Sequence, residues 1–434
     1  MTATAATELE RRTRSKVFWR IIPLCFVLYV ISYINRACIG YAALQMNQDL
    51  GLTSQAFGFA AGIFFIGYFL FEVPSNLALA RFGPRIWIAR ILVTWGIVAI
   101  LTGFINATWQ LYTLRFLLGV AEAGFFPGII IYLTYWFRAR EQATTVAWFV
   151  AAIPVSYLLG APLSTWLMQS MDHLAGLRGW RWMMIVEGVP AVLGGIVAYF
   201  MLTNRPEEAK WLKDDERDWL TGELAAEQAR NTNVKHLSAF RALADPGVLY
   251  LAAIYFVYQC GSLGIGYWMP QIFKNLSSSL SDFQVGLMSM APYAFATVVM
   301  VLWSMSSDRA NERRMHSATP LLVAAIALSF AGVVTTGLSG VILVSAALAG
   351  LYAFKAPFWA LPSLFLSRSS AAVSIAAINS IGNLGGFAGP YAIGVIKDRT
   401  GSATTGLLIL AGLLFVAFAM TMFARLTEGP SKAA

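Results

Sequence analysis

The sequence has few charged side chains, and this scarcity excludes a water-soluble fold. Charged residues make up 12% of its 434 residues, whereas hydrophobic residues make up 58%. A soluble globule of this length needs far more polar surface to cover its core. The composition therefore predicts a protein that lies within a lipid bilayer.

Cysteine and histidine are also scarce, which argues against disulfides, metal sites and catalytic groups. The three cysteines, Cys25, Cys38 and Cys260, lie in apolar stretches without a second cysteine or histidine at ligand spacing. The three histidines are scattered over loops or the ends of apolar runs, so they complete no active-site constellation. We expect no metal, no cofactor and no enzymatic activity, with a membrane-embedded enzyme as a remote alternative.

Long apolar runs dominate what the sequence does contain. About 20 apolar residues cross the ~30 Å hydrocarbon core of a bilayer as a helix. Runs of this length are too long and too apolar for the short alternating strands of a membrane barrel. We therefore predict an all-α membrane protein with twelve transmembrane helices. The expected spans are 19–42, 57–79, 86–104, 111–136, 143–167, 182–202, 248–273, 285–303, 318–338, 342–366, 371–395 and 405–424.

One long polar segment divides these spans into two groups of six. The predicted units are an N-terminal half over 1–203, a central loop over 204–247 and a C-terminal half over 248–434. Within the loop, Trp211, Leu212, Trp219 and Leu220 stand among charged residues, a pattern typical of an amphipathic helix on the membrane surface or against the bundle. Basic turns after the second and eighth spans indicate a weak internal repeat of the two halves.

The distribution of Lys and Arg predicts the orientation in the membrane. Of 31 such residues, three lie within spans, five lie on one side, and the remaining 23 lie on the side of the termini and the central loop. Positive charge accumulates in cytoplasmic loops, so we expect the N-terminus, the C-terminus and the loop in the cytoplasm of a bacterium, with the protein in its inner membrane. Cations in short loops indicate topology, so no nucleic-acid partner is expected.

Three charged residues stand out in the first and fourth spans. A charge at mid-membrane costs about 2.5 to 3.5 kcal/mol unless it is paired or lines a wet cavity. Arg36 lies in the second half of the first span, where it lines a cavity or extends to the outer interface. Arg115 and Glu122 lie two helical turns apart on one face of the fourth span. This pair is functional, or it is a structural pair that closes the span against a neighbour.

A fourth intramembrane charge, Lys355, lies midway along the tenth span beside Pro357 and Pro362. A proline-interrupted span exposes backbone carbonyls where it lines a cavity, although a lysine can also extend to the interface. Together the intramembrane cations outnumber Glu122, so the sequence indicates a positive cavity that binds an anion. Arginine binds a carboxylate through two parallel hydrogen bonds, and Glu122 could exchange a proton according to whether the arginines hold substrate.

Four motifs resemble the anion:cation symporter family of the major facilitator superfamily, and they are distributed over nearly the whole chain. The motifs are FFIGYFLFEVPSN at 64–76, RFLLGVAEAGFFP at 115–127, PFWALP at 357–362 and NSIGNLGG at 379–386. The resemblance is strongest to the bacterial branch that takes up tartrate, phthalate, hydroxyphenylacetate and sugar acids. It implies the major facilitator fold and a monomer embedded in lipid. It also implies secondary active import of a small organic carboxylate by proton symport through alternating access.

The resemblance also implies roles for individual residues. Arg36 would hold the substrate carboxylate, and Arg115 with Glu122 would couple transport to protons. The cavity would be lined by Tyr33, Tyr68, Asn379 and Asn383, with Trp359 as an aromatic wall. Where the family usually has Asp before this arginine, Asn35 stands here and cannot titrate.

Several alternatives stay open from the sequence. An exchanger or an efflux carrier would use the same fold and the same small-residue packing. Tartrate-like and aromatic acids would both satisfy one arginine surrounded by tyrosines, so the sequence does not select the substrate. If Lys355 is structural, one proton on Glu122 favours a monocarboxylate; if Lys355 lines the cavity, a dicarboxylate becomes plausible.

Overall fold

The computed structural model describes residues 3–230, 245–276, 280–310, 312–331, 337–362 and 368–424. These residues form helices joined by short linkers, and the predicted all-α class is confirmed. Among them, eleven helical stretches are long and apolar enough to cross a membrane. The remaining expected span, the eleventh along the chain (371–395), coincides with α16 (Arg368–Asn383) and α17 (Gly385–Thr400), which are 16 residues each and meet at Leu384.

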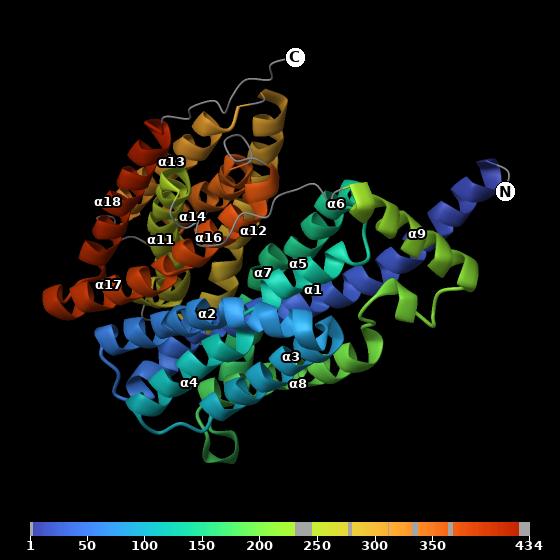
Figure 1. The fold of residues 1–434 in the computed structure, drawn as a ribbon. Coiled ribbons are helices and arrows are strands. Elements are labelled where there is room, and N and C mark those ends of the chain that lie inside the picture. Colours follow the sequence, from blue (N-terminus) through green and yellow to red (C-terminus); the bar gives the residue numbers. More distant parts are fainter. Residues whose placement is uncertain are drawn as a thin grey trace.

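The helices form two bundles. In Figure 1 the blue-to-green helices gather on one side of the molecule and the yellow-to-red helices on the other. The N-terminal bundle contains α1 (Ala3–Asp49), α2 (Ser54–Phe82), α3 (Pro84–Thr102), α4 (Thr108–Glu122), α5 (Phe125–Thr134), α6 (Ala139–Val150), α7 (Ala152–Ser170), α8 (Gly179–Met201) and α9 (Asp214–Arg230). The C-terminal bundle contains α11 (Pro246–Leu276), α12 (Asp282–Ala310), α13 (Arg314–Ala331), α14 (Gly337–Ala360), α16, α17 and α18 (Ala403–Met422). Short 3-10 turns lie at Leu174–Gly176 and Pro206–Glu208.

The fourth and fifth predicted spans are interrupted rather than continuous. Between α4 and α5, Gly124 adopts φ 83°, a left-handed conformation that glycine adopts without strain. A Cβ at this position would also collide with the side chain of Ser75 on α2. Glu122 is therefore the last residue of α4, where its charge adds to the negative end of the helix dipole. The fifth span divides into α6 and α7 at Ala151.

The helix α9 of the central loop packs against the N-terminal bundle. Glu216 binds Arg12 at 2.9 Å and Lys16 at 2.8 Å, both on the polar extension of α1. Burial raises the pKa of Glu216, but the hydrogen bonds and charges of these partners outweigh it and hold the pKa below its usual value. Just before α9, Trp211 stacks on Trp136 with ring centroids 5.4 Å apart. These contacts attach the loop helix to the bundle, the second of the two arrangements expected from the sequence.

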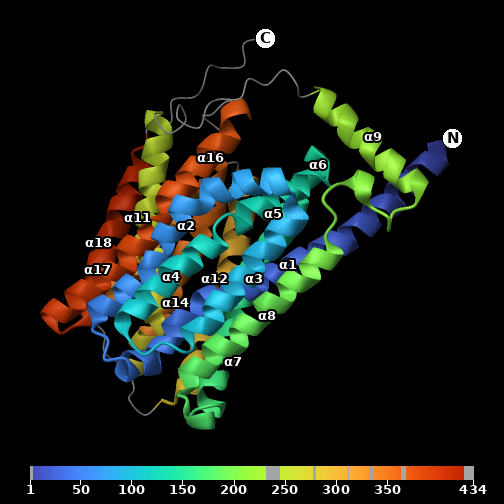
Figure 2. The ribbon, with the colours of Figure 1, turned by 60° about the horizontal axis from the view of Figure 1, so that its bottom comes forward.

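The two bundles meet mainly at one end, which holds the C-terminus of α1 and the N-terminus of α2. Figures 1 and 2 both show α2 beside α17. The Asp398 carboxylate of α17 accepts hydrogen bonds from the backbone amides of Ser54 at 3.0 Å and Gln55 at 2.7 Å. A Cβ on Gly58 would collide with the backbone carbonyl of Pro390, so the helices touch there. We call this end the outer contact, because the predicted orientation places it outside the cell.

Other polar contacts join the bundles at the same end. Gln45 of α1 donates to Asp282 of α12 at 2.9 Å, and Gln55 donates to the Tyr391 hydroxyl at 3.1 Å. In the part of the chain that the structure describes, one further hydrogen bond between the bundles lies away from the outer contact, from Ser380 to Glu72. The arrangement is therefore closed at the outer end.

Candidate functional site

An ion pair between α1 and α4 lies at the centre of the molecule. Nη2 of Arg36 binds Oε1 of Glu122, and the Ser32 hydroxyl donates to the same oxygen at 2.9 Å. The Arg36 side chain is 15% exposed and that of Glu122 is 2% exposed. Arg36 is thus directed into the protein and does not extend to the outer interface. The positive charge of Arg36 also offsets that of Glu122 at the negative end of α4.

Aromatic rings surround the Arg36 guanidinium. Its central carbon lies 5.0 Å from the ring of Tyr33, 5.2 Å from that of Phe64 and 5.6 Å from that of Tyr68. Rings at these distances attract a cation through their electron-rich faces. The structure thus brings together Arg36, Tyr33 and Tyr68, three residues that the family resemblance implies for the cavity. Nε of Arg36 is buried and has no hydrogen-bond partner among the described residues, so this donor is free for a ligand.

Arg115 has a different environment from Arg36, although both contact Phe64. Its Nε donates to the Ala60 carbonyl at 3.1 Å, and its Nη2 donates to the Ala61 carbonyl at 3.3 Å. These bonds tie α4 to α2. Glu122 pairs with Arg36 of another helix, whereas no ion pair with Arg115 appears in the described structure. The two predicted coupling residues thus lie near the same ring but do not bind each other.

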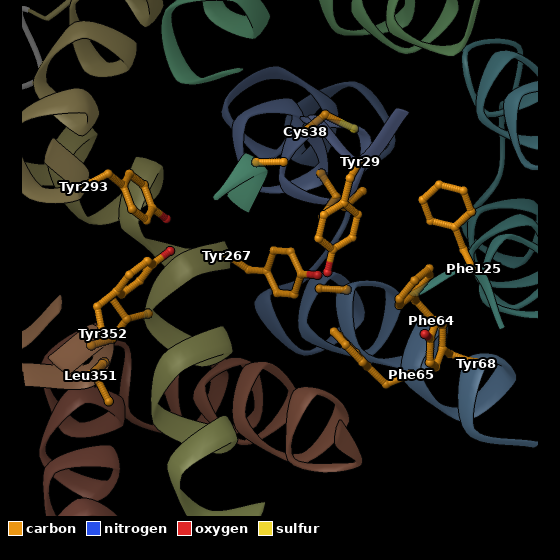
Figure 3. Packing of buried hydrophobic residues seen from close by; sticks show 14 of the residues in the cluster. Tyr29, Cys38, Phe64, Phe65, Tyr68, Phe125, Tyr267, Tyr293, Leu351 and Tyr352 are labelled. Carbon is orange, nitrogen blue, oxygen red and sulfur yellow. The ribbon is translucent and has the colours of Figure 1, made fainter. Parts of the chain in front are cut away.

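Lys355 of α14 faces the site from the C-terminal bundle. Its Nζ lies 5.0 Å from the ring of Tyr352, and its charge is close enough to that of Arg36 for the two to repel each other. Within the described ranges, Lys355 has no acidic partner and no hydrogen bond. In Figure 3 the rings of Tyr352 and Tyr293 lie together beside α11, with centroids 6.2 Å apart. Lys355 is therefore an unpaired cation in an aromatic wall.

The other predicted residues of the C-terminal bundle lie on α14 and α16. Trp359 is half-buried and contacts the Tyr255 ring edge-on at 4.9 Å. Asn383 accepts a hydrogen bond from Gln259 at 2.8 Å. Asn379 is half-buried one turn before it. All three side chains retain partial exposure.

Two further site residues were not identified from the sequence. Tyr267 of α11 extends toward α1 in Figure 3, feels the charge of Arg36, and has a buried hydroxyl without a partner among the described residues. Tyr258 on the same helix has a second such hydroxyl. Their one sequence signal is a tyrosine within an apolar run. That signal is weak because tyrosine is also an ordinary core residue in this protein.

The sequence count of intramembrane charges also omitted Glu72, which lies nearer the end of its predicted span. In the structure Glu72 is buried on α2 and accepts a hydrogen bond of 2.5 Å from Ser380 of α16. It also feels the charge of Arg36. The site therefore contains two carboxylates, Glu122 and Glu72, and the cations Arg36, Arg115 and Lys355 still outnumber them.

Comparisons with known proteins agree with this architecture. The model of the Major Facilitator Superfamily matches residues 25–390. A protein of Agrobacterium vitis named "Putative tartrate transporter" is 50% identical over 96% of this chain and 92% of its own length. A "Quinolone resistance transporter" of Acinetobacter baumannii is 37% identical over 95% of both chains.

A solved structure also shares the fold. It is a bacterial homolog of the human lysosomal transporter Spinster, crystallised in an inward-facing and unoccupied conformation. The two folds superpose with a TM-score of 0.77 over 94% of this chain and 96% of the other, at 15% sequence identity. The family identifies a multi-pass membrane transporter rather than an enzyme. On the family match and the curated relatives, this chain belongs to the Major Facilitator Superfamily.

Proposed function

We propose that this transporter imports a small organic dicarboxylate, of the size and charge of tartrate, together with protons. The observation that carries the proposal is the half-satisfied guanidinium of Arg36. One of its nitrogens binds Glu122, and another, Nε, is buried without a partner among the described residues. A buried unpaired donor is unfavourable by about 1 to 3 kcal/mol. A substrate carboxylate would remove this penalty.

Competition between the substrate carboxylate and Glu122 for Arg36 would couple substrate transport to proton transport. A carboxylate that binds a guanidinium through two parallel bonds uses Nε together with an Nη nitrogen. Such a substrate would displace Glu122 from its contact with Arg36. Glu122 is 2% exposed and stands at the negative end of α4. Without its cation it would bind a proton, so substrate and proton would travel together.

The second carboxylate of the substrate would bind Lys355. This lysine belongs to the opposite bundle, is near Arg36, and has no acidic partner in the described residues. A dianion between Arg36 and Lys355 would attract both bundles and relieve the repulsion of the two cations. Trp359, Asn379, Asn383, Tyr33 and Tyr68 would complete the wall. The relative named for tartrate, at 50% identity, supports this chemistry.

Alternating access would arise from rocking of the two bundles. The outer contact is closed by Asp398 and Gly58, whereas among the described residues one hydrogen bond, from Ser380 to Glu72, joins the bundles away from it. We assign this arrangement to the inward-facing state, with the N-terminus in the cytoplasm of a bacterial inner membrane. The second candidate function is an exchanger or efflux carrier, which the relative named for quinolone resistance favours.

Uptake into proteoliposomes tests the proposal. A pH gradient that is acid outside should drive accumulation of labelled tartrate in the wild type. Counterflow without net accumulation would instead identify an exchanger, and export would identify an efflux carrier. No movement of tartrate under either condition would contradict the proposal.

Lys355→Met tests the dicarboxylate. Loss of one charged hydrogen bond, about 1.5 to 3 kcal/mol, should raise the KM for tartrate about 10- to 100-fold and that for the monocarboxylate gluconate far less. The matched control is Lys397→Met, because Lys397 also lies 5.0 Å from an aromatic ring, that of Trp268, but near the outer contact. Equal effects of Lys355→Met on both acids would exclude the second binding point.

A further inference from the structure

Glu187 of α8 is a buried carboxylate that the proposed mechanism does not use. The residue is 4% exposed. Its Oε1 accepts a hydrogen bond of 2.6 Å from the Ser164 hydroxyl of α7. Its Oε2 is buried without a partner among the described residues. No cation pairs with Glu187 in the part of the chain that the structure describes.

The surroundings of Glu187 contain little to stabilise a negative charge. From α1, the Cys38 thiol lies beside the carboxylate, and the Tyr41 phenol is close enough for the charge of Glu187 to act on it. The helix α7 contributes Ser164. The helix α3 carries its ionisable residues at 85 and 90, near its other end. On α8 itself, Arg181 is six residues away and is bound to Asp49 at 3.0 Å.

An unpaired carboxylate in an apolar interior favours its neutral form. Taking a charge out of water without a partner costs several kcal/mol, whereas a neutral acid with one hydrogen bond costs much less. Glu187 therefore binds a proton as long as its surroundings stay closed. It can release the proton when water or a cation reaches it.

Glu187 lies one layer beneath the outer contact. Ser164, its hydrogen-bond donor, precedes Thr165, and a Cβ on Gly286 of α12 would collide with the Thr165 side chain. Tyr41 of α1 lies against Ser289, also on α12. The helix α12 thus covers the layer that holds Glu187. Separation of α12 from α1 and α7, as the bundles rock, would open that layer to the outside.

Glu187 is also connected to the central site. The Asn35 side chain donates to the backbone carbonyl of Glu187 at 2.8 Å, and Asn35 is the neighbour of Arg36 in the sequence. A change in the position of Arg36 on substrate binding would therefore act on the α1–α8 contact that encloses the Glu187 carboxyl group.

We infer that Glu187 is a second proton-binding site, which takes up a proton from the outside and releases it toward the central site. The inference rests on the proposed proton symport. With Glu122 as the first site, each cycle would bring in one dicarboxylate dianion and two protons, which carry no net charge. Glu187 thus supplies the titratable group that Asn35 lacks, and it makes uptake of a dianion independent of a membrane potential that is negative inside.

The number of coupled protons tests this inference. Purified protein in proteoliposomes is given a gradient of one pH unit, acid outside, with the membrane potential clamped at zero by valinomycin and equal potassium. Labelled tartrate is the probe. Each coupled proton multiplies the limiting accumulation ratio about tenfold per pH unit, because one unit corresponds to 1.36 kcal/mol. We expect a ratio of about 100 in the wild type and about 10 in Glu187→Gln.

The Glu122→Gln variant separates the possible outcomes. If Glu187 carries the second proton, Glu122→Gln should also accumulate tartrate to a ratio of about 10. The double variant should not accumulate tartrate at all. A wild-type ratio of about 10 that Glu187→Gln leaves unchanged would overturn the role of Glu187 and leave proton symport intact. A wild-type ratio of 1 would reject the proposed function itself. If Glu187→Gln does not fold, complete loss of accumulation in Glu122→Gln, with tartrate exchange retained, still overturns the inference.

Discussion

The carboxylates of the outer contact and the Arg36 guanidinium of the central site differ in how far they are satisfied. At the outer contact, Asp398 accepts two backbone hydrogen bonds and Gln45 binds Asp282. At the centre, Nε of Arg36 and the hydroxyl of Tyr267 are buried without partners among the described residues. Helix packing explains the first region without a ligand. The second is unfavourable as packing alone, since each unpaired buried group costs about 1 to 3 kcal/mol.

This difference indicates which region binds and which region closes. Two surfaces that must separate and rejoin need partners in each other for their charged groups, as Asp398 has in the backbone amides of Ser54 and Gln55. A site that must accept a substrate has to keep donors free for it. Two arginines near the centre show a similar contrast: Arg115 donates to the carbonyls of Ala60 and Ala61, whereas Arg36 keeps one donor free.

The largest expected effect follows from Arg36→Lys at the centre. Lysine keeps the positive charge but loses the planar pair of donors that holds a carboxylate. We expect tartrate uptake to fall about 100-fold, as for loss of one strong charged bond of ~3 kcal/mol, with normal amounts of protein in the membrane. Arg90→Lys is the control, because the Arg90 guanidinium also contacts an aromatic ring, with its central carbon 4.0 Å from the ring centroid of Trp87. This contact lies away from the site. Near-normal uptake by Arg36→Lys would remove Arg36 from the substrate site.

A smaller effect is expected at the outer contact from Gly58→Val. The new side chain would collide with the backbone of Pro390, and overpacking of this kind costs about 1 to 3 kcal/mol. The outer contact should then open, so that uptake slows about tenfold while a cysteine at position 55 reacts faster with an impermeant thiol reagent. Gly412→Val is the matched control, because a Cβ there meets no atom within 4 Å. Unchanged labelling in Gly58→Val would show that this contact does not close the transporter.

The smallest effect is expected from Asp398→Asn. A carboxylate at an exposed helix N-terminus contributes about 0.3 to 1 kcal/mol, so loss of its charge should increase labelling of the same cysteine about two- to fivefold. The backbone amide hydrogens of Ser54 and Gln55 should also exchange faster with solvent. If neither rate changes, Asp398 does not stabilise the closed end.

The pH dependence of the outer contact sharpens this prediction. Burial raises the pKa of Asp398, but the hydrogen bonds from Gln55 and Ser54 outweigh it and hold the pKa below its usual value. A lowered pKa means that the contact is stabilised while the carboxylate is charged and that this stabilisation is lost as the outside pH falls through the lowered value. Labelling should therefore rise in strong acid in the wild type. Asp398→Asn should not show this rise.

Much of the fold and part of the site could be predicted from the sequence. Long apolar runs are sufficient to predict membrane helices, because the bilayer fixes their length. Arg36, Glu122 and Lys355 could be identified because a charge in such a run needs a partner or a cavity. These inferences depend on the residue and its own segment alone.

The remainder depends on which helices touch, and a single sequence does not encode that in a readable pattern. Glu122 pairs with Arg36 rather than Arg115 because the chain breaks at Gly124 and α1 passes beside the end of α4. Tyr267 has the sequence pattern of a core tyrosine, and it belongs to the site because α11 packs against α1. Asp398 caps a helix that begins 344 residues earlier, a contact that nothing in its own segment indicates.

Competition between substrate and Glu122 for Arg36 is the central claim, and proton uptake on binding tests it most directly. Tartrate is mixed with purified protein in weak buffer at pH 7, and a pH indicator follows the protons. The account predicts uptake of about one proton per bound tartrate by the wild type, because Glu122 loses its cation and binds a proton. The same uptake is expected from the surface control Glu207→Gln but not from Glu122→Gln. Tartrate binding without proton uptake, or with undiminished uptake in Glu122→Gln, would contradict the account.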